Sequence, residues 1–280
     1  MKKTLLGILL VLPVLALAGA DTTANRKDEI VKNLRKVMEE VLRPENFCVS
    51  YTGERESLDV VKAQAAGIKK VLFNGQKPES VKQAPCIKKN EAFKTSGQVQ
   101  YVAQNGNFRK KGLEYTGALE ILKVILSYDY LWINLRVKGG AYGCMSGFKR
   151  NGESFLVSYR DPHLKRTLEV YQGVPDYIRA FEADEREMTK YIIGTISNKD
   201  VPRTPQMQGS ISKTAYFSNV TEDMLQKERN QILGAQKEDI QKLAALVEAV
   251  LSDDQICVVG SETAIEKAED VFMEVKPLIG

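Results

Sequence analysis

The sequence predicts an α+β fold in which a mostly antiparallel sheet is flanked by helices. The composition, with 43% hydrophobic and 27% charged residues, is that of an ordinary globular protein. Segments with the two-residue alternation of strands and segments with helical periodicity alternate in blocks along the chain. The dipeptide Asn151-Gly152 joins two of the strand candidates and is typical of a tight antiparallel hairpin. Together these observations favour α+β layers over a doubly wound parallel sheet.

The first residues of the chain differ in composition from the rest. Lys2 and Lys3 form a basic start, an apolar stretch runs from Leu5 to Leu17, and small residues follow up to Ala20. This is the pattern of a secretory signal peptide, and the stretch is too short for a comfortable transmembrane helix. We therefore expect residues 1–20 to be a signal peptide and the mature chain to be secreted or periplasmic. After cleavage we expect no stable membrane insertion.

Residues 21–75 are predicted to form a helix–strand–helix unit, and the same order recurs at the C-terminal end of the chain. Cys48 and Cys257 take equivalent places in the two copies, each within an apolar run, and both are expected to be core residues. Two explanations stay open: short units of this kind recur by chance, or residues 21–75 are the tail of a preceding, similar domain. The expected elements are helices at 28–42 and 57–73 around a strand at 47–51, and helices at 240–251 and 263–275 around a strand at 255–259.

A change in composition marks a boundary after residue 75. The chain there becomes rich in Pro, Lys, Gln and Asn, which predicts a linker at 76–95. Residues 96–280 are then expected to form one domain that ends with the C-terminal unit just described. Thr221, followed by acidic residues, is expected to cap a helix. The further elements expected in this domain are strands at 97–103, 141–148 and 154–159, and helices at 116–130, 161–197 and 222–233.

The charge of the chain gives little support to nucleic-acid binding. Lys and Arg number 40 against 36 Asp and Glu, which leaves a net charge of +4. Basic clusters such as 109–111 are short and have no repeated aromatic residues between them. We therefore expect no nucleic-acid partner.

The sequence contains no complete active site. A His/His/Glu zinc centre needs two histidines and a serine or cysteine triad needs one beside its nucleophile, but His163 is the single histidine. No H-x-x-E-H, H-E-x-x-H, G-x-S-x-G or G-x-x-x-x-G-K-[ST] run occurs. His163 follows Asp161-Pro162 at a predicted helix start, where a solvated or capping role is expected. We therefore expect no metal or other cofactor on this chain.

One short segment combines residue types that suit peptide recognition. Between a predicted helix and a predicted strand it carries Arg136, Gly139, Gly140 and Tyr142. An arginine can hold a carbonyl or carboxylate, and a tyrosine can donate a hydrogen bond to a developing oxyanion. Glycines let a peptide backbone approach closely. A helix C-cap glycine followed by a structural tyrosine explains the same residues equally well.

Several ungapped stretches resemble the last domain of presequence proteases, which belong to the pitrilysin and insulinase group of inverzincin metallopeptidases. The resemblance runs from about residue 30 to the C-terminus. The stretches that carry it are Val99–Val102, Gly117–Leu119, Asp129–Trp132, Arg136–Met145, Ser158–Pro162 and Asp184–Ser197.

This resemblance implies a two-layer pitrilysin-like domain at 96–280, preceded by the truncated tail of a similar domain at 21–75. It also implies that a separate N-terminal half carries the zinc ligands and the general base. The last domain of such enzymes contributes an Arg and a Tyr that hold the substrate backbone and help stabilise the tetrahedral intermediate, and Arg136 and Tyr142 match these positions. We therefore expect the chain to bind unstructured peptide, with Arg136, Gly139, Gly140 and Tyr142 as contacts. Its expected partner is a zinc-bearing half whose chamber it completes.

A second interpretation fits the same sequence. The chain is then a stand-alone secreted peptide-binding module, or an inactive fragment, with no catalytic partner. A neighbouring reading frame that encodes H-x-x-E-H and its own signal peptide would favour the first interpretation over the second.

Overall fold

The computed structural model describes residues 27–76 and 89–279, and the chain divides into two compact units. Residues 27–76 belong to the first unit and residues 89–279 to the second. The predicted signal peptide and residues 77–88 of the predicted linker lie outside the described residues.

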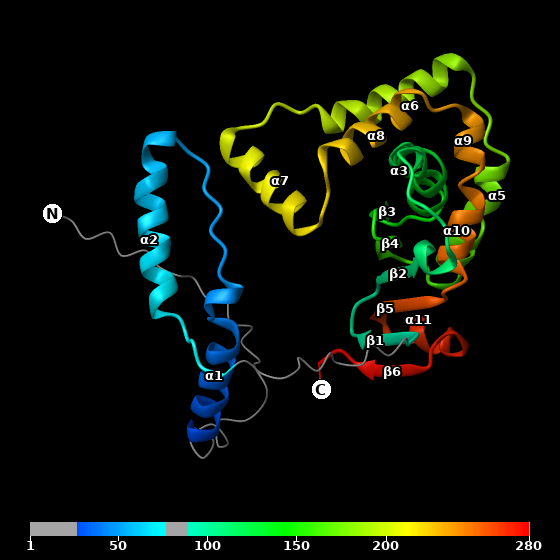
Figure 1. Ribbon diagram of the computed structural model, residues 1–280. Coiled ribbons are helices and arrows are strands. Elements are labelled where there is room, and N and C mark those ends of the chain that lie inside the picture. Colours follow the sequence, from blue (N-terminus) through cyan, green and yellow to red (C-terminus); the bar gives the residue numbers. More distant parts are fainter. Residues whose placement is uncertain (1–26, 77–88, 280) are drawn as a thin grey trace. The chain divides into compact units, whose positions relative to one another are not determined.

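The first unit is a pair of helices joined by short 3-10 turns (Figure 1). Arg43 is only 5% exposed, and its guanidinium donates to the Glu45 carboxylate (2.5 Å) and to the Gly75 carbonyl (2.8 Å). The same guanidinium lies over the Phe73 ring. This arginine therefore ties the residues after the second helix to the end of the first. The elements are α1 (Lys27–Val41), η1 (Pro44–Asn46), η2 (Arg55–Ser57) and α2 (Leu58–Val71).

The strand expected at 47–51 is not formed in this unit. Residues 47–50 have no regular secondary structure, and Cys48 is exposed, so the expectation that Cys48 is a core residue was wrong. A strand needs a neighbour to receive its N–H and C=O groups, and the described residues of this unit supply none. The apolar side of α1 is exposed as well: Val37 is 54% and Val41 56% exposed.

The second unit is built on a mixed sheet of six strands with the order β3-β4-β2-β5-β1-β6 (Figure 1). The pairs β3–β4, β4–β2 and β2–β5 are antiparallel, and β1 pairs in parallel with both β5 and β6. The predicted hairpin and the mostly antiparallel sheet are confirmed. The strands are β1 (Glu91–Thr95), β2 (Gln100–Asn107), β3 (Gly143–Phe148), β4 (Glu153–Asp161), β5 (Gln255–Ser261) and β6 (Glu274–Pro277).

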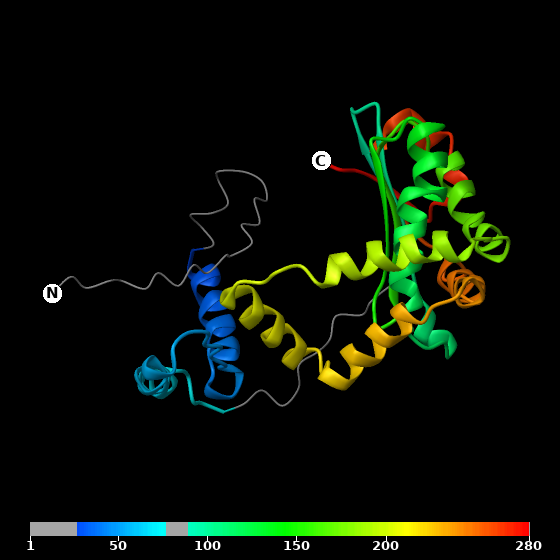
Figure 2. The ribbon, with the colours of Figure 1, turned by 90° about the horizontal axis from the view of Figure 1, so that it is seen from above.

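Helices pack against one face of this sheet and form the core with it. The helices lie on one side of the strands (Figure 2). Side chains along the strands alternate, and the fully buried set, which includes Val102 and Leu156, joins Leu122 and Ile125 of α3 in one hydrophobic cluster. The helices are α3 (Ala118–Tyr128), α4 (Lys165–Gln172), α5 (Val174–Arg179), α6 (Glu185–Lys199), α7 (Pro205–Phe217), α8 (Glu222–Leu233), α9 (Lys237–Gln241), α10 (Ala244–Leu251) and α11 (Glu262–Glu266). Shorter turns are η3 (Phe108–Lys111), the π-helical η4 (Trp132–Val137) and η5 (Glu269–Val271).

The helical stretch expected from 161 to 197 is three separate helices, α4, α5 and α6. Gly173 ends α4, and Pro175 lies in the first turn of α5, where its missing N–H needs no partner. α6 begins after Asp184, whose carboxylate accepts from the Glu187 N–H (2.8 Å), while the Glu187 carboxylate accepts from the Asp184 N–H (3.1 Å). This reciprocal capping box sets the start of the helix.

Three other elements differ from the prediction. The helix expected at 263–275 is instead α11, followed by η5 and the strand β6, and β1 lies within the range predicted as linker. Both strands pair in parallel with segments near the other end of the domain, and such pairing leaves little local sequence signal. Helix α7 was not among the predicted elements. Pro205 occupies its first turn, which Thr204 caps by accepting from the Met207 N–H (3.3 Å).

Candidate functional site

The segment predicted to bind peptide, residues 136–142, begins in the π-helical stretch η4 and ends in a tight turn. Gly140 has a φ of +78°, a conformation that favours glycine, and its N–H donates to the Arg136 carbonyl (2.9 Å). A Cβ atom at Gly139 would lie 2.4 Å from the Leu135 carbonyl oxygen. Both glycines therefore have a conformational reason to be glycine. Their contact with a peptide backbone stays a prediction.

Arg136 is brought directly against Tyr142. Its Nη1 donates to the Tyr142 carbonyl oxygen (2.6 Å), and its guanidinium carbon lies 4.3 Å from the centre of the Trp132 ring and 5.7 Å from that of the Tyr142 ring. No carboxylate within residues 27–76 or 89–279 pairs with this arginine. Because the guanidinium has five N–H donors, it keeps donors for a ligand.

Tyr142 is held by its ring and presents its hydroxyl. The ring lies 5.6 Å from that of Tyr159 and 5.7 Å from the Arg160 guanidinium, whereas the side chain as a whole is 58% exposed. The Tyr142 N–H donates to the carbonyl of Arg160 (3.3 Å), a residue with the unusual φ of +49°. In the described part of the chain the Tyr142 hydroxyl makes no hydrogen bond, so it is available as a donor.

Sequence reasoning about this site missed the residues that surround Arg136 and Tyr142. Trp132, Tyr159 and Arg160 form its walls. All three lie in the stretches that carry the family resemblance, which was the available signal. What the sequence alone did not show is that η4 and the end of β4 meet at this point.

Other chemically active side chains near this site do not make it a complete catalytic centre. Burial raises the pKa of the Cys144 thiol to about 11, although the charge of Arg136 opposes this, so the thiol is protonated at neutral pH. His163 is exposed, and its backbone N–H donates to the Asp161 carboxylate (2.9 Å) at the turn before α4. This position agrees with the expected solvated or capping role.

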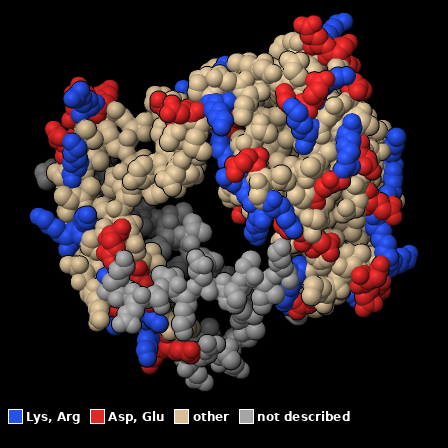
Figure 3. Space-filling model, turned by 45° about the vertical axis from the view of Figure 1, so that its right-hand side comes forward, with Lys and Arg blue, Asp and Glu red and all other residues tan. Residues whose placement is uncertain are grey.

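The described residues contain neither a metal-binding cluster nor a membrane-spanning helix. Within 27–76 and 89–279, no three His, Cys, Asp or Glu side chains gather in a way that would hold a metal ion, so these residues do not fit a zinc centre. Among the helices formed by these residues, none is both long and apolar enough to cross a bilayer. Basic and acidic side chains are interspersed over the face that Figure 3 displays.

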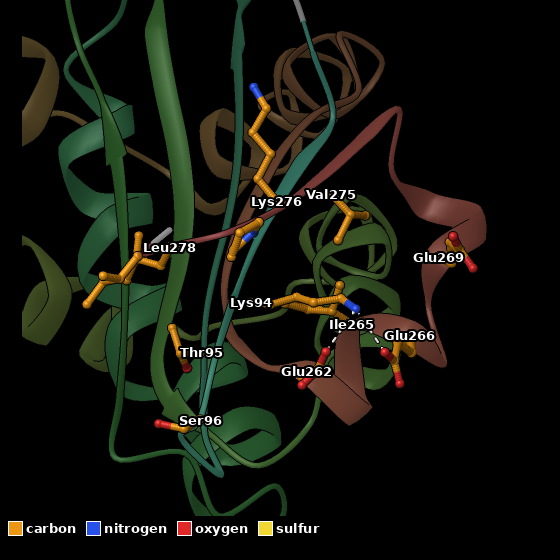
Figure 4. A pocket seen from close by; sticks show the side chains of 12 residues that line it. Lys94, Thr95, Ser96, Glu262, Ile265, Glu266, Glu269, Val275, Lys276 and Leu278 are labelled. Atoms are coloured by element: carbon orange, nitrogen blue, oxygen red, sulfur yellow. Dashed lines mark hydrogen bonds and ion pairs between the residues drawn. The ribbon is translucent and has the colours of Figure 1, made fainter. Parts of the chain in front are cut away.

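One pocket lies at the C-terminal end of the sheet, between β1, α11 and β6 (Figure 4). Its volume is about 760 Å³. Lys94 enters it and donates to Glu266 (2.8 Å) and Glu262 (3.2 Å), and these hydrogen bonds raise the pKa of Lys94. The lysine is therefore already neutralised by its neighbours. None of the four predicted site residues lines this pocket.

A larger groove, of about 1020 Å³, lies at the opposite edge of the sheet, beside β3. It is lined by residues of the β3–β4 hairpin, of α3 and of α7. Tyr142 immediately precedes β3, so the groove borders the strand that leaves the Arg136–Tyr142 site. Its far wall, α7, is the helix that the sequence did not predict.

Comparison with known proteins identifies the domain. The family model described as PreP C-terminal domain matches residues 90–262. The chain belongs to this family. Protein HypA of Clostridium perfringens is 42% identical over 91% of the chain and 26% of its own length. Presequence protease 1, chloroplastic/mitochondrial, of Arabidopsis thaliana is 31% identical over 91% of the chain and 24% of its own length.

The chain thus spans about a quarter of the length of these curated relatives. The part of the relatives that the chain matches is the C-terminal part of a presequence-protease-like peptidase. The α+β architecture, with helices covering one face of the sheet, agrees with this assignment. Among solved structures, a peptidase M16 inactive domain from Pseudomonas fluorescens aligns with 80% of the chain and 52% of its own, with a TM-score of 0.49 and 18% identity.

Proposed function

We propose that this chain is the non-catalytic, peptide-binding C-terminal part of a presequence-protease-like zinc metalloendopeptidase. The observation that carries the proposal is the pairing of Arg136 with Tyr142, two exposed side chains with unused donors, in a domain of this family. The metal and the general base would come from a zinc-bearing half, because the residues described here do not fit a metal centre.

In this proposal Arg136 and Tyr142 act on the substrate backbone. Arg136 keeps one N–H on the Tyr142 carbonyl and directs others at a substrate carbonyl. The Tyr142 hydroxyl donates a hydrogen bond near the scissile carbonyl, where negative charge develops. Main-chain contacts of this kind suit an unstructured peptide, because they do not depend on its side chains.

A second candidate function is favoured by the leader-like residues 1–20. The chain is then a secreted or periplasmic peptide-binding module, or an inactive fragment, that never meets a zinc-bearing half. The first candidate and the peptide-binding module both predict peptide binding by the chain itself, whereas an inactive fragment does not. They differ in whether adding a zinc-bearing half from a relative produces cleavage.

The chain alone is expected not to cleave a quenched fluorescent unstructured peptide, with or without added zinc. The reason is that its single histidine and scattered carboxylates supply no metal site among the described residues. The measurement is fluorescence release by the purified chain, with a chelator-treated sample as control. Chelator-sensitive cleavage that co-purifies with the chain would contradict the proposal.

Arg136→Ala is expected to weaken binding of a fluorescein-labelled unstructured peptide rich in Thr, Ser and Val by about tenfold or more. A hydrogen bond from a charged donor contributes about 1.5–3 kcal/mol, and 1.4 kcal/mol is a factor of ten in affinity. Fluorescence anisotropy gives the Kd. Arg186→Ala, which removes an equal charge from the exposed surface of α6, is the matched control and should bind as the unaltered chain does. Equal losses in both variants would mean that net charge, and not this site, binds the peptide.

A further inference from the structure

The apolar side of α1 faces solvent, although its residues are spaced as in a buried helix. Six apolar residues recur at helical spacing from Val31 to Leu42, and each of them is between 38 and 56% exposed. Single exposed apolar side chains are ordinary on a protein surface, but a continuous stripe of them marks an interaction surface. The six residues, called the α1 stripe below, are Val31, Leu34, Val37, Met38, Val41 and Leu42.

The internal repeat shows what covers such a stripe elsewhere in the chain. When Cys48 is aligned with Cys257 and both copies are followed backwards without a gap, every residue of the α1 stripe falls on an apolar residue. All six equivalents are 5% exposed or less. The same pattern is therefore buried in the C-terminal copy and exposed in the first unit. The equivalents are Ile240, Leu243, Leu246, Val247, Val250 and Leu251.

The segment that follows α1 has the same relation to its equivalent. Residues 47–50 align with residues 256–259 of β5, which is an inner strand, paired antiparallel with β2 and parallel with β1. Val258 of β5 is completely buried, whereas its equivalent Val49 is 46% exposed. Within the described residues, the backbone groups of 48–50 make no hydrogen bond. This segment has the side chains of an inner strand without the neighbouring strands.

The elements that bury the C-terminal copy come before it in the chain. α10 lies against β2 and α5 (Figure 1), and β5 lies between β2 and β1. The same arrangement for the first unit requires a sheet from residues that precede α1 in a relative. Protein HypA of Clostridium perfringens supplies such residues: its match covers 91% of this chain, and so extends into the first unit, but only 26% of HypA.

We propose that the first unit is the element through which this chain docks onto the zinc-bearing half. Residues 47–51 pair as an inner strand of a sheet in that half, and the α1 stripe packs on the face of the same sheet. Strand pairing sets the register, and burial of the six apolar side chains supplies the affinity. This inference rests on the proposed function and adds which surface of the chain makes the assembly.

A second copy of the chain does not offer the same place. The equivalent inner position in the sheet of the second unit is already filled by β5, which has a neighbouring strand on each side. A sheet that lacks this one strand is what the first unit fits. The part of a relative that precedes its match to this chain is the source of such a sheet that the repeat indicates.

Amide hydrogen exchange, measured by mass spectrometry with fragmentation to single residues, tests the strand. The full chain is compared alone and in complex with the part of HypA that precedes its match to this chain. The amides of Cys48, Val49 and Ser50 are expected to exchange fast in the free chain, since they have no partner within the described residues. In the complex all three should exchange at least about a hundredfold more slowly, because an inner strand has a neighbour on each side. The amides of β5 should stay slow in both samples.

Met38→Asp tests the α1 stripe. Met38 is 52% exposed, so the free chain tolerates a charge there, whereas the equivalent Val247 is completely buried. A carboxylate at this place is expected to weaken the complex at least about a hundredfold, as measured by biolayer interferometry. Asn33→Asp adds the same charge at an exposed position of α1 and should bind as the unaltered chain does. Met38→Ala, which keeps a good helix former, should weaken binding about tenfold, so the test does not depend on the folding of the Asp variant.

The outcomes separate this inference from the proposed function. A complex in which the three amides stay fast, or which Met38→Asp and Asn33→Asp weaken equally, overturns the docking element and leaves the proposed function standing. Protection of these amides in the chain alone at high concentration overturns it in favour of a second copy. Absence of a complex, while the chain still binds the fluorescein-labelled peptide, also overturns the docking element alone. A chain that binds no peptide contradicts the proposed function itself.

A joined chain keeps the test decisive if the HypA part is insoluble by itself. That part is then placed ahead of residue 27 in one polypeptide, and the same three amides are followed. Met38→Asp should lower the urea midpoint of the joined chain, and Asn33→Asp should not. Fast amides together with equal midpoints in the two variants would overturn the docking element.

Discussion

In an enzyme assembled from this chain and a zinc-bearing half, we expect Tyr142→Phe to lower kcat by about 10²- to 10³-fold. Removing one preorganised donor to a developing oxyanion has an effect of about this size in other enzymes. The Tyr142 hydroxyl is suited to the role because it makes no hydrogen bond within the described residues, while Tyr159, Arg160 and Arg136 fix the position of the ring.

Phenylalanine keeps these ring contacts, so the variant separates the hydroxyl from the packing. The measurement is kcat and KM for the quenched fluorescent peptide. KM should change less than kcat, because the hydroxyl acts where charge develops and not on the ground-state peptide. Tyr128→Phe is the matched control, since Tyr128 is 72% exposed at the end of α3 and lies outside the site. A Tyr142→Phe enzyme with unchanged kcat would remove Tyr142 from the proposed mechanism.

That Arg136 and Tyr142 lie close together could be predicted from local sequence, because the contact between them is local. Arg136 and Tyr142 are six residues apart, and two glycines between them make the turn that brings them together. The walls of the site were harder to predict. Arg160 reaches Tyr142 through the pairing of β4 with β3 and through a backbone conformation that no local pattern requires.

The same distinction separates the elements that were predicted from those that were not. The hairpin at Asn151-Gly152 and the helices α3 and α8 follow from turn chemistry and periodicity, which act over a few residues. Strand β1 depends on pairing with β5 and β6 across most of the domain, and β6 depends on pairing with β1. The run at 47–51 has the pattern of a strand but no neighbour in its unit, so a correct local preference gave no strand.

The buried carboxylate of Glu228 holds the groove beside β3 together. Glu228, on α8, is 3% exposed and accepts hydrogen bonds from Arg150 of the β3–β4 hairpin and from Lys199 of α6. Arg150 in turn lines the groove and lies over the ring of Tyr115. One side chain therefore joins the hairpin to two helices, and the position of the groove wall depends on it.

Burial opposes ionisation of Glu228, but the hydrogen bond from Lys199 and the charges of Lys199 and Arg150 outweigh it, so the pKa of Glu228 lies below its ordinary value of 4.5. A carboxyl group whose pKa is lowered by folding stabilises the folded state at a pH above its ordinary pKa. That contribution is lost as the pH falls through the lower folded-state value. At neutral pH the ionised network is therefore fully formed.

Glu228→Gln is expected to lower the free energy of unfolding by about 1.5–3 kcal/mol at neutral pH, because it removes the ionised acceptor of the hydrogen bonds from Arg150 and Lys199. Urea unfolding followed by the fluorescence of Trp132, the single tryptophan, reports on the second unit. Glu248→Gln is the matched control: Glu248 pairs with Arg179 but is 49% exposed, and such a pair contributes about 1 kcal/mol or less. The difference between the unaltered chain and Glu228→Gln should shrink as the pH falls below 4.5, since the protonated carboxyl resembles the amide. If both variants cost the same, the network does not hold the groove wall, and the shape of the groove must come from the apolar contacts of α3 and α8 alone.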